Sequence, residues 1–335
     1  MVHMVKTWKD DEISLDPIMG QKIAVIGYGI QGHAQACNMK DSGLDVIVGL
    51  KKGGESWKKA ESDGHAVFEV SEACAKADII HVLIPDMVQA KTYKEQIKAN
   101  LVEGNALSFS HAAAIHWRWI DVPDNIDVIM IAPKGPGSKV RETYLEGFGT
   151  PSIVAVQNDH TSKAWDRTLG IAKAIGSARA GLIKTTFQEE VETDWFGEQA
   201  DLCGGSASMV MNAFETLVEA GYQPEIAYFE VLHELKLIVD MIQRYGIGGM
   251  YRRVSETARF GGLTRGPMVM DAECKERMKK VIEMIKDGTF NSEWTGAYEK
   301  NGKDAFERYM REIDSHQVEK VGRAMRKMMW PDSTE

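Results

Sequence analysis

A single stretch decides the fold: Lys22-Ile-Ala-Val-Ile-Gly-Tyr-Gly-Ile-Gln-Gly32. A short strand rich in β-branched residues runs directly into a G-x-G-x-x-G turn, and residues 33–40 continue with a helical pattern. In such a strand–turn–helix unit, Gly27, Gly29 and Gly32 let backbone amides approach a pyrophosphate at the helix N-terminus. The stretch therefore predicts a dinucleotide-binding domain rather than a glycine-rich turn without a ligand.

The next predicted strand, residues 44–49, ends where such domains read the adenosine ribose. An acidic residue there would favour NAD, but two cations, Lys51 and Lys52, come first, and Ser56 adds a hydroxyl. These side chains suit a 2′-phosphate and predict NADP, whereas the acidic side chain of Glu55 favours NAD. The alternative is an exposed basic loop without a ligand.

Further strands alternate with helices and deliver polar side chains to one edge of the sheet. Predicted strands at residues 77–84, 105–110 and 126–132 are followed by Asp86, His111 and Lys134 respectively. A lone histidine at a strand end is more often structural than catalytic. Several polar groups at the carboxyl edge of a parallel sheet favour a functional cleft there.

The pattern becomes helical from Gln188 onward, and no further strand is expected. The predicted fold is an α/β Rossmann-like domain over residues 1–185, followed by an all-α domain over residues 186–330. Expected helices cover residues 190–201, 206–220, 224–245, 272–287 and 303–328.

Acidic residues recur at helical spacing in this second half. Glu190, Asp194 and Glu198 are four residues apart, which could simply be a solvated acidic face. However, Glu230 and Glu234 share a helix that is apolar on almost every side and is therefore expected to be buried. A buried carboxylate must be paired, neutralised or bound to a cation. Oxygen donors without a nearby thiolate suit Mg²⁺ or Mn²⁺, so we expect a divalent metal site.

Composition narrows the compartment and the partners. The net charge of −9 with 27% charged residues argues against nucleic acid or an anionic membrane as a partner. The first residues lack the apolar core of a signal peptide, and no apolar run approaches the ~20 residues needed to span a bilayer. The scattered cysteines have no C-x-x-C spacing, which favours a reducing cytoplasmic location and disfavours a zinc site: Cys37, Cys74, Cys203 and Cys274.

Long stretches of the chain resemble ketol-acid reductoisomerase (acetohydroxy acid isomeroreductase) of the short-chain class I. The resemblance covers nearly the whole chain. It is carried by Ile26-Gly-Tyr-Gly-Ile-Gln-Gly-His-Ala34, Pro85-Asp-Met-Val-Gln89, Ser108-Phe-Ser-His111, Ala132-Pro-Lys-Gly-Pro-Gly137, Glu189-Glu-Val-Glu-Thr-Asp-Trp-Phe-Gly-Glu-Gln199, Leu202-Cys-Gly-Gly205, Phe214-Glu-Thr-Leu-Val-Glu-Ala-Gly-Tyr-Gln-Pro-Glu225 and Ala227-Tyr-Phe-Glu-Val-Leu-His-Glu-Leu-Lys-Leu-Ile-Val-Asp240.

This resemblance implies specific roles. His111, Lys134 and Glu190 match active-site residues, and Ser255 matches the serine that contacts the substrate carboxylate. The ligands of two Mg²⁺ ions match Asp194, Glu198, Glu230 and Glu234. The NADP contacts match Gly27, Tyr28, Gly29, Ile30, Gln31, Gly32, Lys51, Lys52, Ser56, Asp86, Met87, Val88, Gln89 and Gly137.

The family's activity is implied in the same way. It isomerises 2-acetolactate or 2-aceto-2-hydroxybutyrate by an Mg²⁺-dependent alkyl shift and reduces the product with NADPH, in branched-chain amino acid biosynthesis. Its helical domain is knotted and forms an interlocked homodimer, which in some members assembles further. Departures from the family pattern at Ile30, Gly54 and residues 112–114 concern cofactor preference and the substrate loop.

Two other functions remain as alternatives. A nicotinamide-dependent hydroxyacid dehydrogenase would also join a dinucleotide domain to a helical one, but would need no four-carboxylate metal site. A redox sensor would bind NADP and a divalent ion without turnover. The predicted buried Glu230–Glu234 pair argues against both, since neither role requires it.

Overall fold

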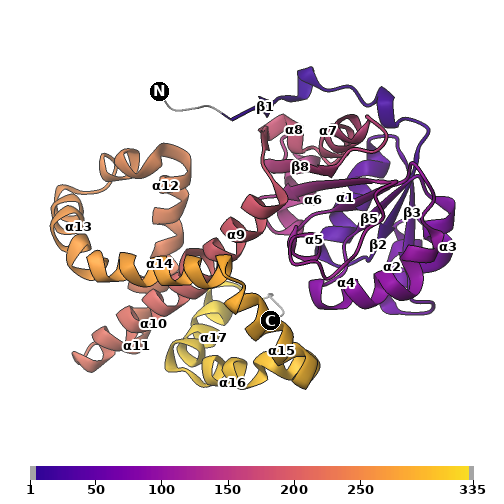
Figure 1. Cartoon of the computed structure of the whole chain (residues 1–335). Helices are drawn as coiled ribbons and strands as arrows, with labels where there is room; N and C mark the ends of the chain where they lie inside the picture. The colour runs from indigo at the N-terminus through magenta and orange to yellow at the C-terminus, as the bar shows by residue number, and fades with distance from the viewer. Residues whose placement is uncertain (1–4, 332–335) are drawn as a thin grey trace. The chain divides into compact units, whose positions relative to one another are not determined.

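The computed structural model describes residues 5–331, which form two compact units that divide between Thr193 and Asp194. The first unit contains the sheet and the second is helical, and each is described here by itself (Figure 1). Within the described residues, no helix is both long enough and apolar enough to cross a membrane.

The first unit is built on a nine-stranded sheet in the order β1-β9-β8-β7-β6-β5-β2-β3-β4. Strands β2 to β7 pair in parallel in the central part, while β8 runs antiparallel to β7, and β1 antiparallel to β9. The strands are β1 Thr7–Trp8, β2 Lys22–Ile26, β3 Asp45–Leu50, β4 Ala66–Glu69, β5 Ile79–Val82, β6 Ala106–Phe109, β7 Asp127–Pro133, β8 Ser152–Asn158 and β9 Leu182–Lys184.

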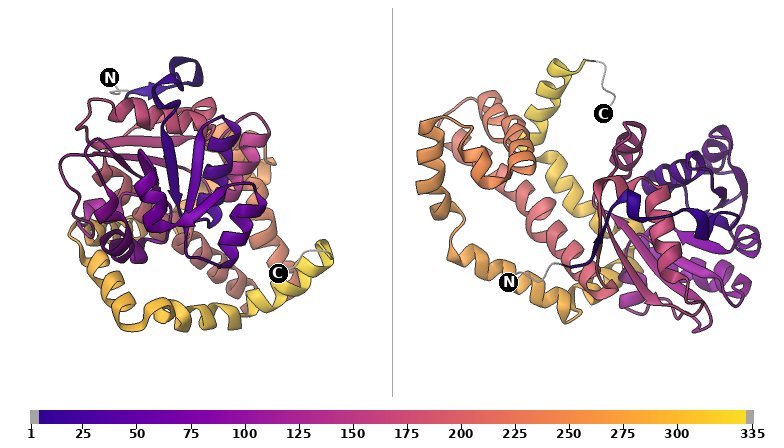
Figure 2. Two further views of the ribbon diagram at one scale, coloured as in Figure 1. Left: turned by 90° about the vertical axis from the view of Figure 1, so that its right-hand side faces the viewer. Right: turned by 90° about the horizontal axis from the view of Figure 1, so that it is seen from above.

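Helices pack on the sheet, so the central strands are buried and read as apolar runs (Figure 2). Ile23 and Val25 of β2 are fully buried, as is Ile79 of β5. The α-helices are α1 Ile30–Asp41, α2 Glu55–Ser62, α3 Val70–Lys76, α4 Asp86–Thr92, α5 Ala113–His116, α6 Gly137–Leu145, α7 Ala164–Ala174 and α8 Ser177–Ala180. Short 3₁₀ or π turns lie at Asp10–Glu12, Asp16–Ile18, Tyr93–Ile97 and Lys98–Asn100.

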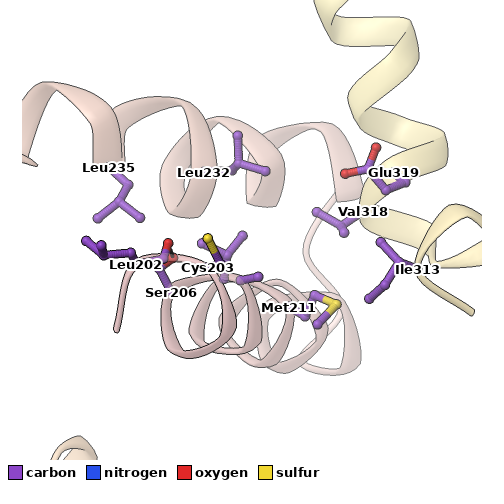
Figure 3. Close-up of a pocket in the computed structure, with 11 residues that line it drawn as sticks. Leu202, Cys203, Ser206, Met211, Leu232, Leu235, Ile313, Val318 and Glu319 are labelled. Atoms are coloured by element: carbon purple, nitrogen blue, oxygen red, sulfur yellow. Dashed lines mark hydrogen bonds between the residues drawn. The ribbon is translucent and has the colours of Figure 1, made fainter. Parts of the chain in front are cut away.

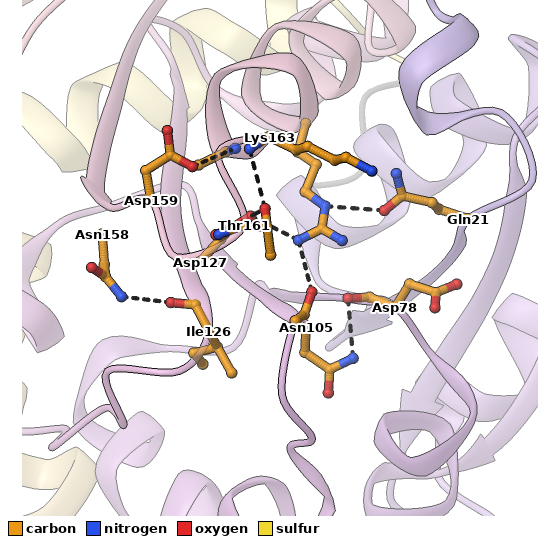
Figure 4. A network of polar contacts seen from close by, with 12 residues as sticks. Gln21, Asp78, Asn105, Ile126, Asp127, Asn158, Asp159, Thr161 and Lys163 are labelled. Carbon is orange, nitrogen blue, oxygen red and sulfur yellow. Dashed lines mark hydrogen bonds and ion pairs between the residues drawn. The ribbon is translucent and has the colours of Figure 1, made fainter.

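A buried ion pair fastens the amino end of β7 to α7. Arg167 Nη1 lies 2.7 Å from Asp127 Oδ2, with exposed side-chain fractions of 9% and 0%. The Thr161 hydroxyl and amide also donate to Asp127, and Arg167 Nε donates to Gln21 (Figure 4). A buried charge pair of this kind is tolerated because its remaining hydrogen-bonding groups are satisfied. The network stabilises the sheet edge opposite the carboxyl ends of the parallel strands.

The second unit is helical throughout its described residues, and helix α9 enters it from the first unit. A small core is formed by Phe214, Tyr228 and Val318. Two π-helical turns interrupt the regular helices, and Gly246, with φ +73°, kinks α12. The elements are α9 Phe187–Gly197, η5 Glu198–Leu202, α10 Gly204–Glu219, α11 Pro224–Tyr228, η6 Phe229–His233, α12 Glu234–Tyr251, α13 Glu256–Val269, α14 Ala272–Lys286, α15 Thr289–Asn301, η7 Gly302–Phe306, α16 Glu307–Ser315 and α17 Gln317–Met329.

The predicted fold class, a Rossmann-like α/β part followed by a helical part, is confirmed. The prediction that the helix carrying Glu230 is buried is wrong for the single chain. Ile226, Leu237 and Val239 on the same helical segment are about half exposed, and Glu230 and Glu234 are exposed. Helical periodicity reports how apolar a segment is, but it cannot say whether the covering surface belongs to the same chain.

Candidate active site

The glycine turn is shaped by close approaches that exclude a side chain. Gly27 has φ +102°, and a Cβ there would lie 2.6 Å from the Leu83 carbonyl oxygen. A Cβ on Gly32 would overlap the Gly27 carbonyl, and one on Gly137 would overlap that of Ile30. The turn therefore packs tightly between β2 and α1, with Gly29 as the extended N-cap of α1. This is the geometry by which backbone amides at a helix N-terminus donate hydrogen bonds to a phosphate.

A network of hydrogen-bonded polar side chains connects this turn to strands β5 and β6. Buried His81 of β5 contacts Ser108 Oγ through Nδ1 and Gln35 Oε1 through Nε2, both at 2.8 Å. Gln35 donates to the Gln31 side chain at 3.0 Å, and Gln31 donates to the Gly135 carbonyl at 3.1 Å. Burial lowers the pKa of His81 to about 4, so the ring is neutral at pH 7. Sequence reasoning missed this network, although a histidine inside an otherwise apolar strand was the available signal.

The predicted 2′-phosphate residues lie beyond β3, the next strand of the sheet. Lys51 and Lys52 are exposed in the turn after β3, and Ser56 is exposed in the first turn of α2. Gly54 is the N-cap of α2, and because glycine has no side chain, the helix has no side-chain cap. The three side chains are therefore free to meet solvent or a phosphate at the carboxyl edge of the sheet.

The segment after β5 lies at the same carboxyl edge of the sheet as the turns after β2 and β3. Helix α4 starts at Asp86, which follows Pro85, and Met87 and Val88 occupy its first turn. Gln89 is buried and donates through Nε2 to the Ile84 carbonyl and to Asp86 Oδ1, both at 3.0 Å. Gln89 Oε1 is buried without a protein partner among the described residues.

A buried carboxylate, Glu190, lies at the centre of the predicted catalytic group. Its side chain is 1% exposed, and Oε2 lies 3.1 Å from His111 Nδ1. Lys134 Nζ lies 3.3 Å from Oε1, and the Ala112 amide donates to Oε2 at 2.9 Å. His111 Nε2 also lies 3.8 Å from Asp86. The structure thus brings together His111, Lys134 and Glu190, which the sequence separates by up to 79 positions.

The charge of Glu190 follows from these contacts. Burial by itself raises a carboxyl pKa, but the hydrogen bond from His111, the Lys134 ammonium and the Ala112 amide outweigh it. The pKa of Glu190 is therefore lowered, and the group is ionised at neutral pH. An ionised carboxylate only accepts hydrogen bonds, so His111 Nδ1 carries a proton. That arrangement leaves His111 Nε2 as the ring atom whose protonation can change.

The four predicted metal ligands fall on two helical segments of the second unit. Asp194 is half-buried in α9, one turn beyond Glu190, and Glu198 begins the π turn η5. Glu230 lies in the π turn η6, and Glu234 begins α12. A π turn has i→i+5 hydrogen bonds, and such turns recur at functional sites. Among residues 5–331, no group of three or more converging metal-binding side chains includes Glu198, Glu230 or Glu234.

Ser255 occupies the N-cap of α13. Its Oγ accepts from the Ala258 amide at 3.1 Å, and the residue is exposed. The structure therefore explains the serine as a helix cap, and it leaves the hydroxyl accessible.

The second unit also contains an apolar pocket of about 320 Å³ (Figure 3). It lies between α10, the η6–α12 segment and the α16–α17 region, and its polar lining side chains include Ser206 and Glu319. The lining lacks the predicted catalytic, metal and substrate residues. It consists of Leu202, Cys203, Ser206, Ala207, Val210, Met211, Leu232, Leu235, Ile313, Val318 and Glu319.

Comparison with known proteins agrees with the sequence resemblance. Residues 17–181 match the family model "Acetohydroxy acid isomeroreductase, NADPH-binding domain", and residues 187–330 match "Ketol-acid reductoisomerase, C-terminal domain". The ketol-acid reductoisomerase (NADP(+)) of Nitrosopumilus maritimus is 77% identical over 332 residues, covering 99% of this chain and 100% of the relative. That of Cenarchaeum symbiosum is 76% identical over the same share of both chains.

A solved structure extends the likeness to three dimensions. It is described as an NADH-preferring ketol-acid reductoisomerase from an uncultured archean. It superposes with a TM-score of 0.93 at 42% identity, covering 96% of this chain and 98% of the other. The resemblance deduced from the sequence is therefore confirmed, and the chain belongs to the ketol-acid reductoisomerase family.

Proposed function

We propose that the chain is an NADP(H)-dependent ketol-acid reductoisomerase. It converts 2-acetolactate or 2-aceto-2-hydroxybutyrate into the corresponding 2,3-dihydroxy acid, in branched-chain amino acid biosynthesis. The observation that carries this proposal is the likeness over 99% of the chain to relatives of that name. The proposal also assigns a role to each domain. Residues 1–185 bind the dinucleotide, and residues 186–330 bind the metal and substrate and form the dimer.

The cofactor is proposed to bind along the carboxyl edge of β2, β3 and β5. The glycine turn would take the pyrophosphate, because its amides meet at the N-terminus of α1. Lys51, Lys52 and Ser56 would hold the 2′-phosphate by charge-assisted hydrogen bonds. Further contacts would come from the side chains and backbone of Asp86, Met87, Val88, Gln89 and Gly137.

The metal site is proposed to consist of Asp194, Glu198, Glu230 and Glu234. All four donors are carboxylate oxygens, which fit Mg²⁺, and each helical segment presents its pair four residues apart. When bound, Mg²⁺ would supply Lewis-acid polarisation of the substrate, and NADPH would supply the hydride. Among residues 5–331, Glu230 and Glu234 belong to no converging group of three metal-binding side chains, which supports assigning one pair in each site to a second chain.

The proton that leaves the substrate hydroxyl is proposed to be transferred by general acid–base catalysis that involves His111, Lys134 and Glu190. Glu190 fixes the His111 ring through Nδ1 and holds the Lys134 ammonium, so that both side chains face one buried anion. His111 Nε2 is then the atom positioned to accept or return a proton. Ser255 is assigned to the substrate carboxylate, since its Oγ and the first amides of α13 are hydrogen-bonding groups for an anion.

An interlocked cytoplasmic homodimer completes the proposal. The single chain leaves large apolar side chains more than half exposed on the second unit, among them Ile247, Phe260 and Val269. Apolar surface on this scale marks a contact with another chain. A second copy covering the α12–α13 surface and the pocket of Figure 3 would bury the helix that carries Glu230.

Product analysis tests the activity. The chain is incubated with 2-acetolactate labelled in the migrating methyl group, together with NADPH and Mg²⁺. We expect a 2,3-dihydroxy acid with the label moved to the neighbouring carbon. Reduction of the ketone without migration would instead identify a hydroxyacid dehydrogenase, and cofactor binding without any product would identify a sensor.

A further inference from the structure

We propose that His33, Cys37, Asp63 and His65 form a second metal site, specific for a thiolate-accepting divalent cation such as Zn²⁺. The site lies in the first unit, on the side of α1 that faces the segment between α2 and β4. Its donors are two imidazoles, one thiol and one carboxylate, which are the ligand types of protein-bound Zn²⁺. It shares no ligand with the proposed carboxylate site for Mg²⁺.

Three of the four donor atoms converge, and the fourth lies beside the thiol. Cys37 Sγ lies 3.7 Å from His65 Nε2, and His33 Nε2 lies 3.4 Å from Asp63 Oδ2. The ligand atoms of His33, Cys37 and Asp63 all lie within 4.8 Å of one another. Zinc bonds of ~2.0–2.3 Å in tetrahedral geometry place neighbouring donors about 3.3–3.6 Å apart. His65 lies outside that group of three, so closing a four-ligand shell requires its ring to move toward His33 and Asp63.

Backbone geometry supplies the donors from two directions. His33 and Cys37 are four residues apart on α1, so both lie on one face of that helix. Asp63 and His65 follow α2, where the Lys40 ammonium fixes the chain by donating to the carbonyls of Asp63 and Gly64. Two donors therefore come from a helix, and two come from a short turn that Lys40 holds in place.

His65 places a further donor beside the thiol. Its ring is 6% exposed, and Nε2 lies 3.7 Å from Cys37 Sγ. Nδ1 is the other ring nitrogen, and it is buried without a protein partner among the described residues. A metal shared with Cys37 would therefore bind at Nε2.

Tyr28 acts as an outer partner of these ligands. Its hydroxyl donates to Asp63 Oδ2 at 2.9 Å and lies 3.4 Å from Cys37 Sγ. Tyr28 belongs to the glycine turn, and a cation at this site would therefore stiffen the turn that is proposed to bind the pyrophosphate. Outer-shell groups of this kind orient the ligands that they touch.

The cysteine pattern alone could not have revealed this site. The sequence argued against zinc because no two cysteines are closely spaced. The structure instead combines one cysteine with two histidines and an aspartate from segments that are 28 residues apart.

Cobalt substitution tests the proposal on the full-length protein. Chelator-treated protein is titrated with Co²⁺, and the thiolate-to-cobalt charge-transfer band is followed in the near ultraviolet. The proposed Mg²⁺ ligands are oxygen donors and give no such band. We expect a band that saturates at one Co²⁺ per chain and is displaced by Zn²⁺. Absence of the band in the wild-type protein overturns the proposal.

Matched variants identify the ligands. Cys37→Ser is expected to abolish the band, and His65→Gln is expected to weaken Zn²⁺ binding about tenfold or more. Cys203→Ser removes an exposed thiol outside the site and is expected to leave the band unchanged. Cys37→His keeps a donor, so it is expected to retain Zn²⁺ without the band. A band that survives Cys37→Ser, or one that is lost in Cys203→Ser, contradicts the assignment.

Discussion

Glu190 Oε2 lies 3.1 Å from His111 Nδ1, with the carboxylate 1% exposed. This contact joins the helix that opens the second half of the chain to the segment after β6, and Lys134 reaches the same carboxylate from the end of β7. The buried anion sets both the orientation of the histidine ring and the position of the ammonium.

Replacing Glu190 with glutamine tests that arrangement. Glu190→Gln keeps the shape but removes the charge, so His111 and Lys134 lose their shared anion. We expect turnover to fall by about 10²-fold or more, with NADPH affinity nearly unchanged. Steady-state kinetics and cofactor titration measure the two effects. Glu189→Gln, on the exposed side of α9, is the control and is expected to retain turnover. Equal losses in both variants would contradict the role of Glu190.

The neutral state of His81 predicts a pH dependence of stability. The folded pKa is about 4, below the ordinary 6.5, so protons bind preferentially to the unfolded chain between these values. The contribution is intact above pH 6.5 and is lost as the pH falls toward 4, on the order of 3 kcal/mol in the free energy of unfolding.

Urea unfolding of the wild type and His81→Gln at several pH values between 7 and 4 measures this term. We expect His81→Gln to be less stable at pH 7 but to change less with pH than the wild type. His160→Gln, at a more exposed site, serves as the control. Parallel pH profiles of wild type and His81→Gln would show that burial of His81 does not govern this dependence.

Cofactor preference depends on the exposed turn after β3. Lys51→Asp combined with Ser56→Asp places negative charge where the 2′-phosphate is proposed to bind. We expect the ratio of kcat/KM for NADPH over NADH to fall by about 10- to 100-fold, since charge-assisted hydrogen bonds contribute about 1.5–3 kcal/mol. Lys58→Asp, also exposed on α2, controls for net charge. A wild-type enzyme equally efficient with both cofactors would refute the assigned preference. The comparison matters because the solved relative is itself described as NADH-preferring.

Shared metal sites predict complementation between inactive chains. Homodimers of Asp194→Asn or of Glu230→Gln have two damaged sites. Co-expressed mixed dimers are expected to regain roughly half of the wild-type activity, because both lesions fall in one site and the other site is intact. Two affinity tags isolate the mixed dimers. Purified mutants that are simply mixed are expected to recover little, since chains interlocked as proposed would not exchange without unfolding. Inactive mixed dimers would place all four ligands in one chain.

The sequence predicts helices and strands best where their boundaries depend on local chemistry alone. The β-branched strand and glycine turn at residues 22–32 gave β2 and the start of α1, because turn chemistry is local. Helices α13 and α15 were missed, and the expected helix at residues 303–328 is broken at His316. Those segments have weak periodicity or a local cap that competes with continuation.

The sequence could propose candidate site residues but not their geometry. The π turns at Glu198 and Phe229 add one residue to a helical turn and leave no simple mark on the sequence. The contact of His81 with Gln35 depends on the register of β5 and β6 on the sheet and the packing of α1. The exposure of Glu230 depends on which chain covers its helix, which a single sequence does not specify.

Magnesium-dependent NADPH oxidation by the wild-type protein tests the central claim most directly. The rate with 2-acetolactate is measured in Mg²⁺ and again with EDTA in excess over the metal. The account predicts steady NADPH consumption with Mg²⁺, no consumption with EDTA, and full recovery when Mg²⁺ is restored. Consumption that persists in EDTA, or no consumption in Mg²⁺, would contradict a metal-dependent reductoisomerase.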